Sequence, residues 1–277
     1  DLTDKVGKID IQGKNSARIL SKVLNNPDNV FSSFPYFSFK GWYEDTSVAT
    51  ELVSLTDGTP VMLSRTGYTG EFGFEIFISP EKLLAIWQIL LDAGEEYLLK
   101  PCGLAARDSL RAGAVLPLSH QDIGDWPFAN NPWPFALADR GDDERFTKEF
   151  IGSHALTALQ SADYTLPFAG FDPRKMVVSD KAFVMDEKGE KIGTILTCAT
   201  DMAIGRVGEG IVSIATGEEK PEGFVPRGLS CGFVRVDRRL DPGDIVVLTD
   251  GKRKINVEIR HDVRPDRTAR RPIREMV

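Results

Sequence analysis

Residues 65–76 read RTGYTGEFGFEI, with three glycines in seven positions and one carboxylate, Glu71, among them. PVMLSRTGY before this stretch and FGFEIFI at its end both read as strands, the second because its apolar residues alternate. Gly67 and Gly70 predict a tight turn between the two strands, since glycine adopts positive φ without steric cost. The pattern leaves open whether the turn is an ordinary hairpin or a loop that grips a ligand with Glu71.

Strands and helices alternate around this turn. GKIDIQG (7–13) alternates apolar and polar residues and predicts a strand, and the aromatic FPYFSF (34–39) predicts another. SARILSKVL (16–24), KLLAIWQILLDAG (82–94) and CGLAARDSLRAGA (102–114) predict helices, because apolar residues recur every three or four positions or because glycine ends the segment. These ββαα units indicate an α+β or mixed fold and not a doubly wound parallel sheet.

The C-terminal part of the chain reads differently. From about residue 167, short alternating segments are separated by the turns DEKGE, DPGD and TDGK, which is typical of a small antiparallel barrel or sandwich. We therefore expect two domains, 1–165 and 166–277. The segment 119–143, rich in prolines and aromatic residues, predicts a long loop without regular structure.

Composition narrows the class of protein. The chain has 277 residues and a formal net charge of −7, which argues against a nucleic-acid binder that relies on bulk charge but not against an anionic ligand held by local arginines. Its three cysteines are far apart, and so are its three histidines, so neither a disulfide framework nor a metal site is expected. A reducing, cytoplasmic compartment fits best, and neither a membrane-spanning stretch nor a secretory signal is visible.

Glu71 is the first candidate for binding chemistry. A carboxylate can accept two N–H bonds from an amidine-like edge, such as that of a 2-amino-pyrimidinone, in a charge-assisted bidentate pair. That edge is the pairing face of a pterin. No phosphate-binding glycine loop, dinucleotide fingerprint or serine nucleophile elbow is present in the sequence.

Each of the other candidates has a structural alternative, which the residues by themselves favour. Arg107 and Arg111 share one helix face and point to a binding role, or they are solvated or paired with Asp108 or Asp92. His120 fits a general base, a ligand donor or a capped loop residue. Trp126 and Trp133 fit either a packed core or stacking on a flat ligand. The arginines of VRPDRTARRP (263–272) fit either a solvated face or the attraction of an anionic tail.

Taken together, the motifs resemble one family. RTGYTGEFGFEIF followed by LKPCGLAARDSLRAGAVLPLSHQDI (99–123) resembles the aminomethyltransferase family, the T-protein of the glycine cleavage system. The likeness extends through FIGSHAL (150–156) and GEKIGTILT (189–197). GKIDIQGKNSARIL resembles the family's mid-chain strand and helix, with Lys14 in place of a proline.

The resemblance implies a mixed α/β folate-binding domain of the T-protein type and a C-terminal antiparallel β-barrel, arranged with a further domain around a cavity for tetrahydrofolate. Glu71 falls on the pterin-binding glutamate, Tyr68 lies in the same loop, and Arg107 matches an arginine of the active centre, which makes it the catalytic candidate. His120 falls at a variable position of the family, and His120, Trp126 and Trp133 are the candidates for a substrate pocket. The implied reaction moves a methylene group from an aminomethyl donor on a lipoyl carrier protein to tetrahydrofolate and releases ammonia.

Two departures from the family keep other functions open. The family's catalytic aspartate precedes the strand matched by residues 7–13, so we expect a fragment, or a second chain that supplies this part, and no complete reaction by this chain alone. The loop after His120 and the stretch 207–232 also differ, which keeps open the alternative of a related tetrahydrofolate-dependent demethylase (methyltransferase) acting on a small O-, N- or S-methyl donor. A folate-binding module without catalysis is the alternative of another class.

Overall fold

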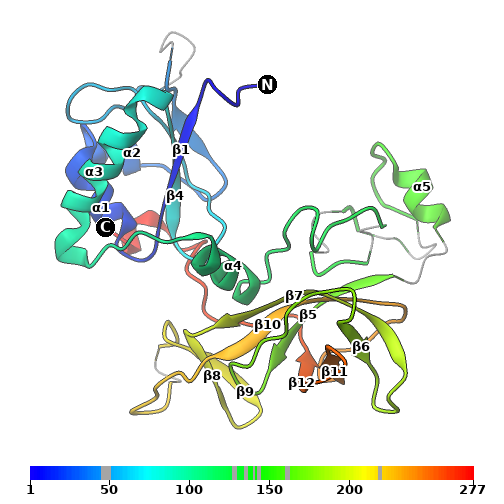
Figure 1. The fold of residues 1–277 in the computed structure, drawn as a ribbon. Helices are drawn as coiled ribbons and strands as arrows, with labels where there is room; N and C mark the ends of the chain where they lie inside the picture. Colours follow the sequence, from blue (N-terminus) through cyan, green and yellow to red (C-terminus); the bar gives the residue numbers. More distant parts are fainter. Residues whose placement is uncertain are drawn as a thin grey trace. The chain divides into compact units, whose positions relative to one another are not determined.

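The computed structural model describes residues 1–44, 51–126, 130–133, 137–139, 141, 145–159, 163–217 and 220–277. The chain forms two compact units, one made of Asp1–Arg107 with Arg267–Val277 and the other of Asp108–Asp266. The second unit is thus inserted, along the sequence, between the two parts of the first. Both are drawn in Figure 1.

The first unit is built on a four-stranded antiparallel sheet with the strand order β1, β4, β3, β2. The strands are β1 Gly7–Gln12, β4 Gly73–Ile78, β3 Met62–Ser64 and β2 Phe39–Gly41. In the β1–β4 pair, Ile9 lies opposite Ile76 and Ile11 opposite Phe74. Because side chains alternate along a strand, these four residues share one face, and all four are buried in the core of the unit.

Helices complete this core. They are α1 Ser16–Val23, α2 Pro27–Phe31 and α3 Leu83–Gly94, with short 3-10 turns at Pro80–Lys82, Glu95–Tyr97 and Ile273–Glu275. A further helix, α4 Leu104–Gly113, begins in the first unit and continues into the second, where Ala112 is buried in a separate apolar cluster. α1 packs against α3 and buries Ala17, Leu20 and Val23, which follow the helical spacing. The C-terminal segment contributes Met276 to the same apolar cluster, so the last residues of the chain are part of the first unit's core.

The second unit contains a closed barrel of six antiparallel strands in the order β10, β5, β12, β11, β6, β7 (Figure 1). They are β5 Tyr164–Gly170, β6 Phe183–Met185, β7 Lys191–Asp201, β10 Leu229–Val236, β11 Ile245–Thr249 and β12 Lys254–Ile259. A hairpin of β8 Ile204–Val207 and β9 Gly210–Ser213 and the helix α5 Ser153–Ala158 also belong to this unit. Gly243 and Gly251 adopt φ of 103° and 85° in the predicted DPGD and TDGK turns.

The predicted fold class is confirmed, with a mixed α/β unit and an antiparallel barrel. The division at residue 165 stays a prediction about domains; β5, the first strand of the barrel, begins at Tyr164. None of the helices in the described ranges has the length and apolar character that crossing a membrane requires.

One predicted strand is wrong. The segment 34–39 forms a turn, and a strand begins only at Phe39. Phe37 adopts a left-handed φ of 63°, which breaks an extended strand, and its side chain is 70% exposed. Aromatic content alone therefore misled the prediction, because these rings are not an inward-facing alternate set.

Candidate functional site

The glycine-rich loop joins β3 to β4, as the sequence predicts. Gly70 adopts a φ of 74° and lets the chain reverse just before Glu71, whose side chain is half-buried. The Glu71 backbone N–H donates to Thr69 Oγ1 at 3.1 Å, which closes a local turn. The loop thus presents Glu71 from a fixed backbone.

The other two glycines are needed for a different reason than the one predicted for Gly67. Neither adopts positive φ; instead a Cβ on Gly67 or on Gly73 would lie 2.2 Å from Gln12 Oε1. The Gln12 side chain fills that space and donates from Nε2 to the carbonyls of Thr66 and Phe74, both at 3.2 Å. Gln12, at the end of β1, therefore packs against Gly67 and Gly73 and holds both ends of the loop by hydrogen bonds.

Glu71 is also held by a residue 197 positions away in the sequence. Thr268 Oγ1 donates to Glu71 Oε2 at 2.7 Å and accepts from the Phe72 N–H at 2.9 Å. The next backbone N–H, of Ala269, donates to the Gly70 carbonyl at 3.1 Å. The C-terminal segment therefore lies directly against the glycine loop.

Arg65, at the start of the loop, is one of the largest fully buried side chains. Its guanidinium donates to the carbonyls of Gly73, Ala269 and Arg271 at 2.9 to 3.1 Å, and its Cζ lies 3.7 Å from the centre of the Phe72 ring. Burial lowers the pKa of Arg65 to about 10, which keeps the group charged at neutral pH. Arg65 thus joins the loop to the C-terminal segment by charge-assisted hydrogen bonds.

Tyr68 and Arg107 are in contact. The Arg107 guanidinium lies 5.3 Å from the centre of the Tyr68 ring, within cation–π distance, and Arg107 is exposed in the first turns of α4. The loop carries both Tyr68 and Glu71. The structure therefore brings three of the predicted site residues into one neighbourhood of the first unit.

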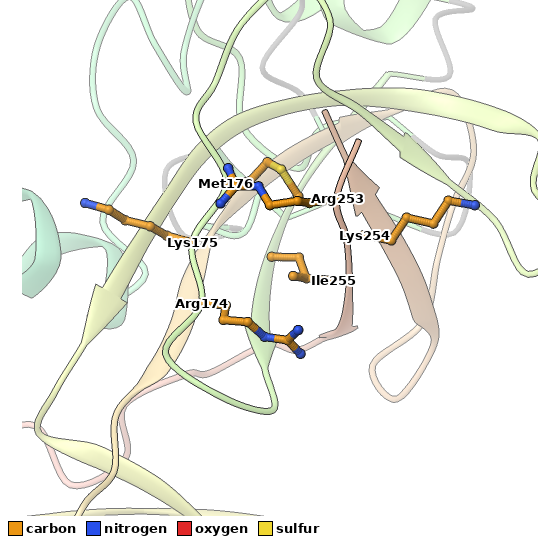
Figure 2. A pocket seen from close by; sticks show the side chains of 6 residues that line it. All are labelled: Arg174, Lys175, Met176, Arg253, Lys254 and Ile255. Atoms are coloured by element: carbon orange, nitrogen blue, oxygen red, sulfur yellow. The ribbon is translucent and has the colours of Figure 1, made fainter. Parts of the chain in front are cut away.

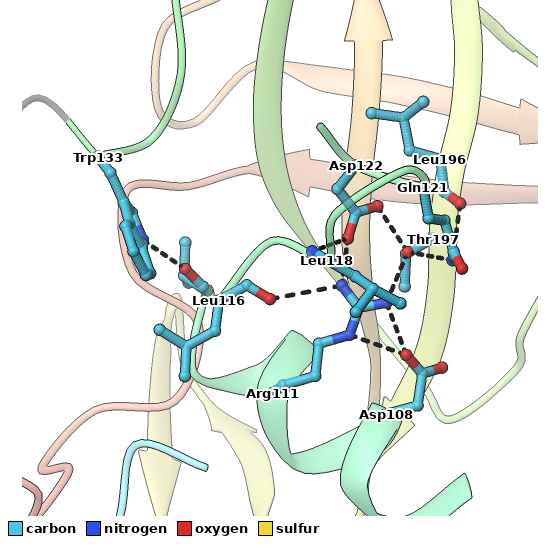
Figure 3. Close-up of polar contacts among 10 residues, drawn as sticks. Asp108, Arg111, Leu116, Leu118, Gln121, Asp122, Trp133, Leu196 and Thr197 are labelled. Atoms are coloured by element: carbon cyan, nitrogen blue, oxygen red, sulfur yellow. Dashed lines mark hydrogen bonds and ion pairs between the residues drawn. The ribbon is translucent and has the colours of Figure 1, made fainter. Parts of the chain in front are cut away.

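Arg111, one helical turn further along α4, is bound in a buried network (Figure 3). Its guanidinium pairs with Asp122 and with Asp108, and it donates from Nη2 to Thr197 Oγ1 at 2.9 Å. Thr197 in turn donates to Asp122 Oδ1 at 2.7 Å. Burial lowers the pKa of Arg111, but the two carboxylates raise it more, so its pKa lies above the ordinary value.

This network shows Arg111 paired with Asp108, which is one of the structural alternatives that the sequence left open. Asp108 accepts from Arg111 Nε at 2.8 Å, in the i, i+3 geometry of a helix. The network also distinguishes the two arginines of the motif, because Arg111 is only 1% exposed whereas Arg107 is exposed to solvent. Of the pair, Arg107 is the one able to reach a ligand.

His120, Trp126 and Trp133 lie in the second unit. His120 is exposed with a φ of 66°, and its Nδ1 lies 2.9 Å from Ser119 Oγ. Trp126 Nε1 donates to Thr165 Oγ1 at 3.3 Å, and Trp133 Nε1 donates to the Val115 carbonyl at 2.8 Å (Figure 3). Both indoles thus have protein partners, and the pocket role of all three residues stays a prediction.

The arginines near the C-terminus divide into two kinds. Arg264 is 3% exposed, donates to the Leu110 carbonyl at 3.0 Å and pairs with Asp201 at 3.5 Å, so a solvated face is the wrong description for it. Arg270 and Arg271 are exposed. Of the predicted arginine run, therefore, at least one member is structural.

A hollow on the barrel is lined by Arg174, Lys175, Met176, Arg253, Lys254 and Ile255 (Figure 2). Each arginine is already held by a neighbouring aspartate, Asp172 or Asp250. The two lysine side chains extend away from each other (Figure 2). Because these cations do not converge as a compact anion would require, we assign no ligand to the hollow.

Sequence reasoning missed Gln12, Arg65 and Thr268, the residues that hold the loop. Gln12 stands in the quoted strand and Arg65 in the quoted loop, but neither residue type at one position indicates which backbone atoms it binds. Thr268 falls within the arginine run, yet its contact with Glu71 joins distant parts of the chain. Only the fold reveals that contact.

Comparison with known proteins identifies the family. Residues 1–127 match the family model described as GCVT N-terminal domain. The chain is 32% identical over 199 residues to an aminomethyltransferase of Caldanaerobacter subterraneus, covering 71% of this chain and 48% of that protein. It is 29% identical over 259 residues to an aminomethyltransferase of Halothermothrix orenii, covering 93% of this chain and 60% of that protein.

A solved structure shows the same fold. The glycine cleavage system aminomethyltransferase T from Bartonella henselae aligns with a TM-score of 0.61 at 21% identity, covering 96% of this chain and 61% of the other. The chain therefore belongs to the aminomethyltransferase family, that of the glycine cleavage T-protein. It spans about half the length of the first curated relatives it matches.

Proposed function

We propose that this chain binds tetrahydrofolate with the glycine loop of its first unit and serves in an enzymatic one-carbon transfer to that folate. Family membership supports the proposal, and so does the observation that carries it: a half-buried glutamate, Glu71, fixed on a glycine turn by the hydroxyl of Thr268. Tyr68 lies in the same loop and contacts Arg107.

The donor set fits a reduced pterin. The Glu71 carboxylate accepts the N–H bonds of the 2-amino-pyrimidinone edge, and a negative charge strengthens such bonds. The Tyr68 ring offers an aromatic face for a flat ring system, and Arg107 holds that ring by a cation–π contact while remaining exposed. A carboxylate beside an aromatic ring suits a flat ligand with an N–H edge, whereas the carboxylate would repel a phosphate.

The work of these residues is binding and orientation. When bound, tetrahydrofolate supplies the nitrogen, N5, that accepts the one-carbon unit. Glu71 sets the rotation of the pterin ring, and Arg107 supplies a fixed positive charge near it. Holding the acceptor in one orientation removes part of the entropic barrier to transfer.

The proposal also names the one-carbon donor. We assign an aminomethyl group on a lipoylated carrier protein, whose methylene carbon moves to tetrahydrofolate with release of ammonia, in the cytoplasm. The names of the curated relatives support this choice over a methyl donor. The residues that activate the donor are not assigned among those described above.

A binding titration tests the folate site. Glu71→Ala should weaken tetrahydrofolate binding about a hundredfold, because two hydrogen bonds to a charged group are lost, and Arg107→Ala about tenfold. Glu81→Gln and Arg18→Ala remove the same charges from exposed positions and should leave the affinity unchanged. If Glu71→Ala and Arg107→Ala bind as tightly as the wild type, the site assignment is wrong.

A second assay tests the donor. The full-length protein that carries this chain should transfer the one-carbon unit from an aminomethylated lipoyl carrier and release ammonia. Methoxy, N-methyl and sulfonium compounds serve as the competing donors. Turnover of a methyl compound with none of the carrier would contradict the aminomethyl assignment and favour a demethylase.

A further inference from the structure

The C-terminal segment 268–271 is attached to the glycine loop through both backbone and side chains. The Ala269 N–H donates to the Gly70 carbonyl at 3.1 Å, and Arg65 donates from Nη2 to the carbonyls of Ala269 at 2.9 Å and Arg271 at 3.1 Å. A few residues later Met276 is buried in the core of the same unit. The segment is therefore anchored on both sides of its contact with the loop.

Thr268 stands at the centre of this contact and is 7% exposed. Its hydroxyl accepts the Phe72 N–H at 2.9 Å and lies 2.7 Å from Glu71 Oε2. A hydroxyl has one proton to donate, and an amide N–H cannot accept it, so the proton is directed to the carboxylate. The polarity of the pair is thereby fixed, with Phe72 N–H donating to Thr268 and Thr268 donating to Glu71.

This arrangement couples the carboxylate to the loop backbone. Thr69 accepts the Glu71 N–H at 3.1 Å, and Thr268 holds the far end of the same side chain. A glutamate side chain has several rotatable bonds, and a hydrogen bond at its tip selects one rotamer before a ligand arrives. The rotamer that is selected decides where a bidentate partner must sit.

We propose that Thr268 is a positioning residue of the pterin site and that the segment 268–271 is part of that site, although it follows Glu71 by about two hundred residues in the sequence. Thr268 acts through Glu71 and not on the ligand. The inference rests on the proposed function, because it assumes that Glu71 receives the pterin.

The test compares Thr268→Val, which keeps the shape and removes the hydroxyl, with Thr268→Ser, which keeps the hydroxyl. Tetrahydrofolate affinity is measured by titration of each variant. Thr268→Val should bind about tenfold more weakly than the wild type, and Thr268→Ser should recover most of the affinity. Thr249→Val is the matched control, since it removes another buried threonine hydroxyl, bonded to the Arg253 carbonyl at 2.9 Å in the barrel.

A double-mutant cycle separates positioning from a loss of fold. If Thr268 acts through Glu71, Thr268→Val should change the affinity of a Glu71→Ala protein by less than about twofold, because that protein has no side-chain acceptor at position 71 for the Thr268 hydroxyl. An equal tenfold loss in both backgrounds would assign Thr268 a purely structural role and overturn the inference. Unchanged affinity of Thr268→Val in the wild-type background would overturn it as well.

Failure of the proposed function would give a different binding result from failure of the inference about Thr268. In that case the wild type does not bind tetrahydrofolate, or Glu71→Gln binds as well as the wild type. If Glu71→Gln weakens binding and Thr268→Val does not, the folate site stands and the inference about Thr268 fails.

Discussion

Arg111 and Asp122 form an ion pair in which 1% and 0% of the two side chains are exposed. The pair links α4 to the loop that follows it, and Thr197 ties Asp122 to strand β7 of the barrel. Within the second unit, the end of the helix is thus fixed by charge and hydrogen bonds and not by apolar packing alone. Breaking the pair would leave the buried Arg111 charge with only the partly exposed carboxylate of Asp108, which is costly.

We therefore expect Asp122→Asn to lower the free energy of unfolding by about 3 kcal/mol. Urea unfolding measures this change. Arg174→Met is the contrast, because its ion pair with Asp172 lies at the surface, and it should leave the unfolding midpoint unchanged. Equal effects of the two substitutions would show that burial of the Arg111–Asp122 pair is not what stabilises it.

The close packing of the glycine loop predicts which atoms a glycine-to-alanine substitution would clash with. Gly67→Ala should destabilise the protein by roughly 1 to 3 kcal/mol, because the new Cβ meets the Gln12 side chain. Gln12→Ala should relieve most of that cost, since the atoms in the way belong to this side chain. Gly73→Ala should not be rescued in the same way, because its Cβ would also lie 2.6 Å from the Ile11 carbonyl oxygen, which is backbone. Thermal unfolding of the three single and two double variants tests the pattern.

Cys198 makes stability depend on alkaline pH. Burial raises the pKa of its thiol to about 11, against about 9 for an ordinary thiol. The folded state therefore keeps its proton where the unfolded state loses it, so this contribution to stability is full below pH 9 and is lost as the pH rises through 11. Between pH 9 and pH 11, the urea concentration at the unfolding midpoint should therefore fall less steeply in the Cys198→Ser variant than in the wild type.

The control for this prediction is the exposed cysteine, Cys102. Cys102→Ser should leave the pH dependence as in the wild type. In the native protein at pH 8, iodoacetamide should label Cys102 and leave Cys198 unlabelled, since the thiolate is the reactive form. Labelling of Cys198 at a similar rate would contradict a raised pKa.

Arg107 should separate binding from stability. It is exposed and its side-chain contact is with the Tyr68 ring, so Arg107→Leu should leave the unfolding midpoint within about 0.5 kcal/mol of the wild-type value. The tetrahydrofolate affinity of Arg107→Leu should nevertheless fall. The affinity of Arg107→Lys should fall less, because the positive charge is retained. A large loss of stability in Arg107→Leu would indicate that the arginine is structural, as Arg111 is.

The sequence predicted the elements better than their contacts. The strand at Gly7–Gln12 and the helices at Ser16–Val23 and Leu83–Gly94 were predictable, because apolar periodicity is a local property of the chain. The turn with Glu71 was predictable from its glycines and from the family resemblance. The strand expected at 34–39 was wrong, since aromatic residues mark a strand only when they alternate into a core.

The contacts that hold the site residues in place could not be predicted from the sequence. Thr268 and Glu71 meet only because the chain returns to its first unit after the barrel, and no local pattern encodes that return. Likewise, Arg107 and Arg111 look equivalent on a helical wheel, but the structure buries one and exposes the other. Roles that depend on burial or on distant partners require the fold.

The central claim is that the Glu71 carboxylate reads the N–H edge of a pterin, and its most direct test is a comparison of two ligands. The affinity of the wild type for tetrahydrofolate is measured against that for its 2-desamino analogue, which lacks the exocyclic amine, and the pair is measured again with Glu71→Gln. We predict that the wild type prefers tetrahydrofolate by about tenfold or more and that Glu71→Gln loses most of this preference. Equal affinity of the wild type for both ligands, or a preference that survives Glu71→Gln intact, would contradict the claim.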